Sequence, residues 1–226
     1  MANIFLMRHG KVQGEAALYG HTDVGVDEQE NKQLAALVGY FFNLQERIPV
    51  AVLSSPLRRC STLADQVSTE LSLPKPMLLP TLKEMNFGRY DGVNFDELYQ
   101  QVDPWCQLER FWQDPVQHPL PDAELLTGFV YRVNQAWQTL LKQLEESQGD
   151  LFVVCHGGVI RMILALILNI NVRNPNWYTQ LSIGYGSLTK IDVLAQQTRV
   201  KYISRPLSTV NDRVTKPSSD VDLELG

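Results

Sequence analysis

The sequence predicts an α/β protein, a three-layer α/β/α sandwich around a mostly parallel central sheet. Three short apolar runs lack the polar alternation of a strand with one face in water. They are "NIFLM" (3–7), "VAVLS" (50–54) and "LFVVC" (151–155). A helical pattern follows each run, and this alternation of strand and helix is typical of parallel sheets that are covered on both faces.

The first half of the chain supplies two of the expected helices. Residues 27–46 place apolar side chains at Leu34, Leu37 and Phe41, and residues 57–71 repeat such a pattern. The segment 94–121 differs because it is rich in proline, glutamine and aromatic residues. It predicts short helices and loops that form a lid-like insertion.

The second half resumes the helical pattern over 124–146 and again over 157–169. "LSIGYGSLTKIDVL" (181–194) and "TRVKYIS" (198–204) predict a late hairpin or edge strands. The expected domain covers 1–205, and the polar residues 206–226 are expected to form a loosely ordered tail.

The composition narrows the class of protein. The 226 residues are 44% hydrophobic, which is enough for one domain with a sizeable core. A net charge of −5 argues against a nucleic-acid partner held by a broad basic surface. The three cysteines form no CxxC pair, which disfavours a zinc site or disulfide framework and predicts a cytoplasmic protein.

No membrane partner is expected either. The N-terminus lacks the basic and apolar stretches of a signal peptide. The most apolar run, "VIRMILALILNINV" (159–172), is interrupted by Arg161 and is shorter than the roughly 20 residues that span a bilayer. It predicts a buried helix.

Unusual polar residues follow each of the three buried strands. The first run ends on Arg8-His9-Gly10-Lys11, the second on Ser54-Ser55-Pro56-Leu57-Arg58-Arg59, and the third on His156-Gly157-Gly158. Ligands of open α/β sheets bind outside the carboxyl ends of the strands, so the three groups are expected to converge in one crevice.

The second and third groups suggest an anionic ligand. Ser55 is a favourable N-cap and Pro56 suits the first helical position, which places Arg58 in the first turn, where a cation opposes the helix dipole unless an anion is bound. Arg59 is expected to be a surface cation. Gly157 and Gly158 would let backbone N–H groups approach an anion closely.

Phosphoryl chemistry fits these residues. The fork of Arg8 or Arg58 matches phosphate oxygens, and cations near His9 would keep its imidazole neutral and nucleophilic. A departing alkoxide needs a proton. Glu84 in "LKEMNFGRYDG" (82–92) is the expected donor, with Asp91 and Glu15 as competitors for the role.

Four motifs, in this order, resemble the histidine phosphatase superfamily in its phosphoglycerate-mutase-like branch. They are "LMRHG" (6–10), "SSPLRRCSTLA" (54–64), "LKEMNFGRYDG" (82–92) and "VVCHGG" (153–158). The resemblance implies the phosphoglycerate-mutase-like fold, with His9 as the nucleophile and Arg8, Arg58 and His156 on the phosphate. It further implies Glu84 as the proton donor and neither a metal nor another cofactor.

Further residues are expected around the substrate. They are Gly10, Lys11, Gly20, His21, Thr22 and Gly157. Lys11 is equally compatible with a substrate contact and with an ordinary surface position, and His21 would border the pocket with a solvated ring. The family's usual Glu-Thr and Asn after the nucleophile motif are replaced here by Lys11, Val12 and Glu15.

The predicted function is therefore a phosphomonoesterase for a small phosphorylated metabolite. Arg110 is the single basic residue of 94–121, which favours a phosphatase over a phosphoglycerate-type phosphomutase. The length, "LYGHTD" (18–23) and the acid motif look most similar to the alpha-ribazole-5′-phosphate phosphatases of cobalamin biosynthesis. A phosphomutase and a non-catalytic phospho-ligand-binding module are the alternatives, and a homodimer is left open.

Overall fold

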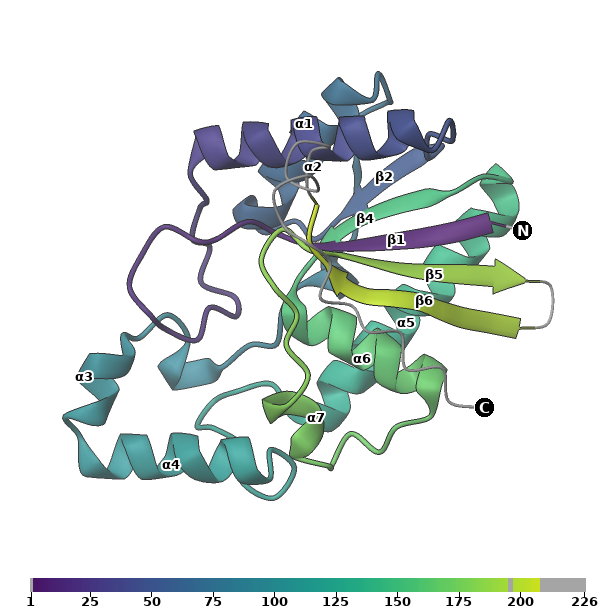
Figure 1. The fold of residues 1–226 in the computed structure, drawn as a ribbon. Coiled ribbons are helices and arrows are strands. Elements are labelled where there is room, and N and C mark those ends of the chain that lie inside the picture. Colours follow the sequence, from purple (N-terminus) through teal and green to yellow (C-terminus); the bar gives the residue numbers. More distant parts are fainter. Residues whose placement is uncertain (1, 195–196, 208–226) are drawn as a thin grey trace, which may run out of the picture.

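A computed structural model describes residues 2–194 and 197–207 of the chain (Figure 1). The predicted α/β class is confirmed, since one six-stranded sheet lies between helices. The strands are β1 (Ala2–Arg8), β2 (Ala51–Ser54), β3 (Met77–Leu78), β4 (Leu151–Cys155), β5 (Leu188–Leu194) and β6 (Gln197–Arg205). The helices are α1 (Glu28–Leu44), α2 (Arg58–Glu70), α3 (Phe95–Tyr99), α4 (Val102–Gln113), α5 (Leu126–Ser147), α6 (Gly157–Leu168) and α7 (Asn176–Thr179). The expected tail lies outside the described residues from position 208 onward.

The strand order is β3-β2-β4-β1-β5-β6. The three apolar runs form β1, β2 and β4, and these strands pair in parallel through β4, as predicted. The late hairpin is also confirmed, because β5 and β6 are antiparallel and β6 forms an edge. The two-residue strand β3 was not predicted, because its side chains are exposed and two residues show no periodicity.

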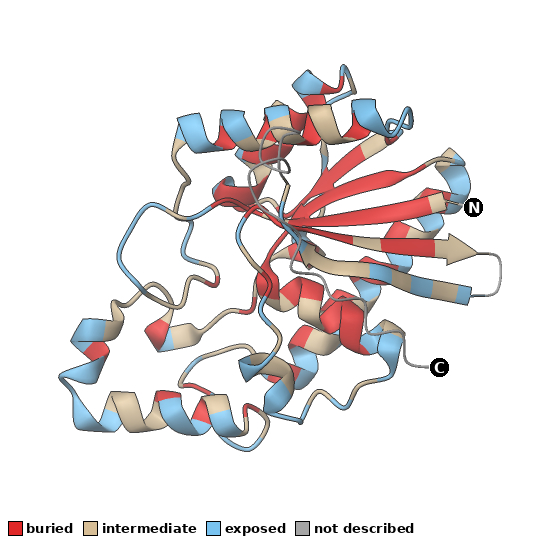
Figure 2. Ribbon diagram, in the orientation of Figure 1, coloured by how far each residue is buried: buried red, intermediate tan, exposed pale blue. Residues whose placement is uncertain are grey.

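The strands are covered on both faces. Helices α1 and α2 lie on one side of the sheet and α5 and α6 on the other (Figure 1), and the central strands are buried along their length (Figure 2). Successive side chains of β1 point to opposite faces, so Phe5 and Met7 join the core under α1 and α2, whereas Ile4 and Leu6 join the core under α5 and α6. Each such side chain contributes about 1.5–3 kcal/mol on burial. The double burial explains why these strands read as continuous apolar runs.

The sheet has a switch point between β1 and β4. The two strands are parallel neighbours and end side by side, with Arg8 opposite Cys155. The helix that follows β1 covers one face of the sheet, whereas the helix that follows β4 covers the other (Figure 1). The segments that follow β1 and β4 therefore diverge to opposite faces of the sheet just beyond Arg8 and Cys155. Ligands of open α/β sheets bind at such a point.

The segment 94–121 forms short helices and loops, as predicted. Helices α3 and α4 project away from the sheet (Figure 1). Their aromatic side chains pack edge to face, with ring centroids 6.0 Å apart for Phe95 and Trp112 and 5.9 Å apart for Trp105 and Trp112. Closure of this segment as a lid stays a prediction.

The apolar run at 159–172 forms most of α6, and seven of the helix's residues are buried, as predicted. Within the described residues, no helix combines the length and the apolar character that a membrane crossing requires.

Candidate active site

His9 lies immediately beyond β1 and is only 5% exposed. Its Nδ1 is 2.7 Å from the carbonyl oxygen of Gly10. A carbonyl can only accept, so Nδ1 carries the proton and Nε2 keeps its lone pair. Burial, with the charges of Arg59 and Arg8, lowers the pKa of His9 well below its usual value. His9 is therefore a neutral imidazole with a free Nε2.

His156, directly after β4, is fully buried, and its ring centroid is 5.2 Å from that of His9. Arg59 Nε donates to its Nδ1 at 3.3 Å, so the Nε2–H donates to Ser55 Oγ at 2.8 Å. Burial lowers the pKa of His156 well below its usual value, and His9, Arg59 and Arg8 lower it further. The two histidines are thus a neutral pair at the switch point.

Arg59, and not Arg58, is the arginine of α2 that lies beside the histidines. The Arg59 side chain is fully buried, so its expected surface position is wrong. Arg58 is exposed, and its backbone N–H donates to Asp23 at 2.7 Å. The physical reason is helical periodicity, because Arg59 shares the inward face of α2 with Leu63.

Arg59 also ties a distant loop to the site. Its guanidinium donates to the carbonyls of Tyr19 at 3.0 Å, Gly20 at 2.6 Å and Thr22 at 2.9 Å. The Asp91 carboxylate holds the same loop from the other side, accepting from the N–H groups of Gly20, His21 and Thr22. The expected substrate residues Gly20 and Thr22 therefore have defined backbone positions near the histidines.

The start of α2 differs from the expected Ser55 cap. The helix begins at Arg58 with Leu57 in the N-cap position. The Ser55 hydroxyl accepts from His156 and, at 3.4 Å, from the N–H of Leu57, which precedes the helix. The Asp23 carboxylate, 35 residues before Arg58, caps the helix through the Arg58 N–H. Capping by a residue so far away in sequence follows only from the tertiary fold.

Arg8, the last residue of β1, carries an unsatisfied donor. Its guanidinium donates from Nη1 to the Ile183 carbonyl and lies 3.7 Å from the centroid of the Tyr185 ring. Its Nε is buried and has no hydrogen-bond partner among the described residues. That atom lies 3.5 Å from the position that a Cβ on Gly157 would occupy. The unpaired Nε–H of Arg8 thus lies beside the first residue of α6. An anion bound there would gain a hydrogen bond from Arg8 close to the N-terminus of a helix.

Glu84 approaches the same helix start. Its Oε2 accepts from the Gly158 N–H at 2.9 Å and its Oε1 from the Met85 N–H at 3.0 Å. A Cβ at position 158 would displace this carboxylate from its present place, so glycine lets Glu84 come this close to the helix start. The carboxyl expected to donate a proton and the arginine expected to bind phosphate therefore meet at Gly157 and Gly158.

The two competitors of Glu84 are placed elsewhere. Asp91 accepts four backbone N–H groups, and these lower its pKa although burial raises it. These four bonds make the Asp91 carboxylate an anchor for the backbone of residues 20–22 and 87, whereas Glu84 is the carboxylate at the start of α6. Glu15 is exposed and accepts from Asn94.

An ion pair braces the segment that carries Glu84. Arg132 of α5 forms a two-point contact with Glu124, at 2.9 Å and 2.6 Å. The same guanidinium donates to the carbonyls of Thr81, Lys83 and Glu84 at 2.8–3.2 Å. These bonds fix the backbone from which the Glu84 side chain extends.

Of the remaining residues expected to contact the substrate, Gly10 and Gly157 lie beside the candidate catalytic side chains. Gly10 orients His9 through its carbonyl, and Gly157 lies beside Arg8. Lys11 is exposed. His21 is partly exposed, but its Nε2 is buried without a partner among the described residues, and burial and the charges of Lys83 and Arg132 lower its pKa.

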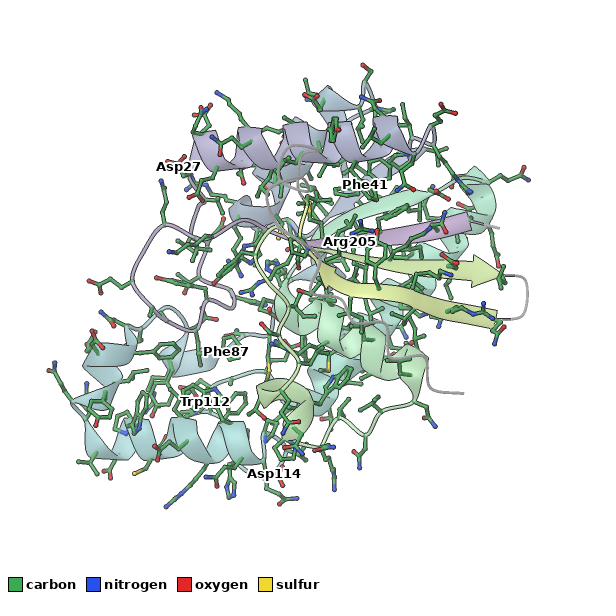
Figure 3. The ribbon with its side chains drawn as sticks, in the orientation of Figure 1. Asp27, Phe41, Phe87, Trp112, Asp114 and Arg205 are labelled. Carbon is green, nitrogen blue, oxygen red and sulfur yellow. The ribbon has the colours of Figure 1, made fainter. Side chains whose placement is uncertain are left out.

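A cavity of about 200 Å³ lies against Glu84. Its wall includes Gly158 and Arg161 of α6 and five aromatic rings, Phe87, Phe111, Trp112, Phe129 and Tyr178. Figure 3 shows Phe87 and Trp112 close to each other above α4. Sequence reasoning missed Arg161 and Tyr185 as site residues, although Arg161 stands out as a charge within an apolar run.

The geometry gives less support to a cysteine nucleophile or to a metal site. Cys60 and Cys155 are fully buried, and burial raises the pKa of both thiols, which disfavours a thiolate nucleophile. Across residues 2–194 and 197–207, no cluster of three or more His, Cys, Asp or Glu side chains is arranged to hold a metal ion.

Comparison with known proteins agrees with the fold and the motifs. The family model of the histidine phosphatase superfamily (branch 1) matches residues 4–205. A curated putative phosphoserine phosphatase 2 of Hydrogenobacter thermophilus is 25% identical over 219 residues, covering 91% of this chain and 96% of that protein.

Two solved structures share the fold. Bacillus stearothermophilus YhfR superposes with a TM-score of 0.78 at 21% identity, covering 91% of this chain and 98% of that one. The alpha-ribazole phosphatase of Shigella flexneri superposes with a TM-score of 0.73 at 21% identity, covering 92% and 98% of the two chains.

Proposed function

The chain belongs to the histidine phosphatase superfamily (branch 1), and we propose that it hydrolyses small phosphomonoesters through a phosphohistidine at His9. The observation that carries the proposal is the state of His9. Its Nδ1–H is held by Gly10, its Nε2 is free, and its pKa is lowered by burial and by two arginines. A buried, neutral and oriented imidazole beside an unsatisfied arginine donor is suited to attack a bound phosphoryl group.

In the first step, the phosphate sits over the first residue of α6, where Arg8 Nε, which has no partner among residues 2–194 and 197–207, gains one. His9 Nε2 attacks phosphorus, the N–P bond forms, and the bond from phosphorus to the alcohol oxygen breaks. Glu84, in its protonated form, gives its proton to the departing oxygen. Arg8 and Arg59 stabilise the charge that develops on the phosphoryl oxygens.

In the second step, a water molecule replaces the alcohol. The Glu84 carboxylate removes a proton from this water as its oxygen attacks phosphorus. The N–P bond breaks, inorganic phosphate leaves, and His9 recovers its lone pair while Glu84 recovers its proton. Both steps use groups of this chain, so we propose a metal-independent reaction.

The substrate and the compartment belong to the proposal as well. Alpha-ribazole 5′-phosphate is one candidate, supported by the resemblance of the acid motif and by the aromatic wall beside Glu84. A cytoplasmic location is supported by three cysteines that are all unpaired.

The test is hydrolysis of p-nitrophenyl phosphate in the presence of EDTA, followed by a screen of phosphorylated metabolites that includes alpha-ribazole 5′-phosphate. We expect phosphate release by the native chain, no release by His9→Ala, and normal release by a control in the exposed His118, His118→Ala. Full activity of His9→Ala would refute the proposal.

The same material separates the two alternatives. A phosphoglycerate-type mutase would form 2-phosphoglycerate from 3-phosphoglycerate with little phosphate release. A non-catalytic module would be stabilised against heat by vanadate without turning over any compound of the screen.

A further inference from the structure

Two guanidinium groups, those of Arg8 and Arg161, lie over the start of α6. The point that a Cβ on Gly157 would occupy is 3.5 Å from Arg8 Nε and 3.7 Å from Arg161 Nη1. Burial lowers the pKa of Arg161, and the charge of Arg8 lowers it further, whereas Glu84 raises it. Two cations at such a short separation repel each other unless anions neutralise them.

Arg161 is held rigidly in this place. Its Nε donates to the Leu181 carbonyl at 3.0 Å, and its own carbonyl accepts from Trp177 Nε1 at 3.2 Å. The Nε bond restrains the plane of the guanidinium, which places Nη1 beside Gly157 while the residue lines the cavity. Such a preoriented fork suits a planar carboxylate or another oxyanion.

The position of Arg161 relative to Glu84 shows which part of a substrate it meets. The group that protonates the departing oxygen must lie beside the leaving alcohol. Glu84 and Arg161 line the same cavity, and His9 lies outside its wall. The cavity therefore extends from the leaving-group side of the reaction centre, and Arg161 faces the alcohol portion.

The size and lining of the cavity limit that alcohol portion. Its volume is about 200 Å³, and a cavity of about 150 Å³ is known to admit benzene. One ring-sized apolar group therefore fits between the aromatic side chains, with Arg161 as the cation among the described wall residues and Glu84 as the carboxyl group.

We propose that Arg161 is a specificity-determining residue that binds a second anionic group, a carboxylate, on the alcohol portion of the substrate. The favoured substrates are phosphomonoesters with a ring-sized apolar body that carries this carboxylate. The inference rests on the proposed phosphatase activity but on no particular natural substrate.

The test uses two substrates that differ in one charge, meta-carboxyphenyl phosphate and its neutral analogue meta-carbamoylphenyl phosphate. The readout is the ratio of their kcat/KM values. We expect the native chain to favour the carboxylate by about ten- to hundredfold, the range of a charge-assisted pair of hydrogen bonds. Arg161→Gln should bring the ratio close to one, and Arg161→Lys should restore part of it.

A matched control is Arg173→Gln, which removes an exposed arginine outside the cavity and should keep the native ratio. A binding measurement by calorimetry with the two corresponding benzylphosphonates, which cannot be hydrolysed, gives the same comparison without turnover. If neither ester is hydrolysed but the phosphonate preference appears and depends on Arg161, the proposed hydrolysis fails, and Arg161 is shown to bind the carboxylate of a ligand but not to set the specificity of a reaction.

Two results would overturn the inference while leaving the phosphatase intact. One is a native chain that treats the charged and neutral members of each pair alike. The other is an Arg161→Gln variant that weakens both members equally, which would place Arg161 on the transferred phosphoryl group.

Discussion

Adjacent arginines at the start of α2 have opposite surroundings. Arg58 is exposed, whereas Arg59 is buried against His156 and three loop carbonyls. Their neighbouring positions make them a matched pair, because either substitution changes the net charge by the same amount. The difference in activity between the two variants therefore measures the contribution of the buried guanidinium of Arg59.

We predict that Arg59→Gln lowers kcat/KM for p-nitrophenyl phosphate by about 10²–10³-fold, the cost of losing one donor for developing charge. Arg58→Gln should stay within a few-fold of the native chain. Steady-state kinetics test this, with melting curves to show that the Arg59 variant is folded at the assay temperature. Equal loss in both variants would contradict the assignment of Arg59.

At this scale the sequence contained the signal for Arg59. The residue lies four positions before Leu63 and eight before Val67, so it continues the apolar stripe of α2. The orientation of Arg161 could not be predicted in the same way, because it depends on the carbonyl of Leu181, 20 residues away in sequence. Side-chain roles that rest on such long-range bonds need the fold.

Among the structural elements, the start of α5 supports the acid segment through Arg132 and Glu124. The pair is about one-fifth exposed, and Arg132 binds three carbonyls of the segment 81–84. Arg132 bonds to the backbone carbonyl of Glu84 and to Glu124, and its guanidinium lies over the Phe129 ring, so we assign it as a positioning residue for Glu84.

We predict that Arg132→Gln slows hydrolysis of alkyl phosphates more than hydrolysis of p-nitrophenyl phosphate. An alkoxide needs the proton of Glu84, whereas p-nitrophenolate leaves readily without it, and such proton transfer contributes about 10²–10⁴-fold. The readout is the ratio of the two kcat values, with Glu84→Gln as the reference for complete loss of the acid. Exposed Arg89→Gln serves as the control.

A merely structural role for Arg132 would lower both kcat values by the same factor. Arg132→Lys keeps the charge but loses the two-point contact, so we expect an intermediate ratio. An unchanged ratio in both variants would contradict the positioning role.

Elements with a strong periodic signal were predicted well. The three parallel strands and the helices α1, α2, α5 and α6 follow from apolar runs and 3.6-residue periodicity. The cap of α2 and the strand β3 were missed for local reasons, since Asp23 reaches the helix from another loop and β3 has two residues. Closure of 94–121 is a property of motion, and it stays a prediction.

At the scale of the whole molecule, the site couples stability to pH. His9 and His156 are buried as neutral rings, so their folded-state pKa values lie below the unfolded value of about 6.5. As the pH falls below about 6.5, the unfolded chain binds protons that the folded chain does not. Stability is therefore full above that pH and is lost as the pH falls.

We predict a loss of up to about 1.4 kcal/mol per pH unit for each histidine below that point. Urea unfolding between pH 7 and pH 5 measures the slope. His9→Asn and His156→Gln should each flatten it, and His118→Gln, at an exposed position, should leave it unchanged. Identical slopes in all four proteins would contradict the burial of neutral histidines.

The molecule as a whole brings four separated motifs to one switch point. His9 and His156 follow neighbouring parallel strands, Arg59 reaches them from α2, and Glu84 reaches the start of α6. The convergence was predictable because carboxyl ends of parallel strands share one edge of a sheet. The leaving-group cavity was not predictable, because its wall combines residues from six separate segments.

The central claim is that the phosphoryl group is carried by His9. The most direct measurement mixes the native chain with a radiolabelled aryl phosphate, quenches the reaction in alkali after one turnover, and maps the labelled peptide. We predict label that is stable in base, labile in acid and confined to the peptide that contains His9. Label on His156 or on any other side chain, or a burst of released alcohol with no label on the protein, would contradict the account.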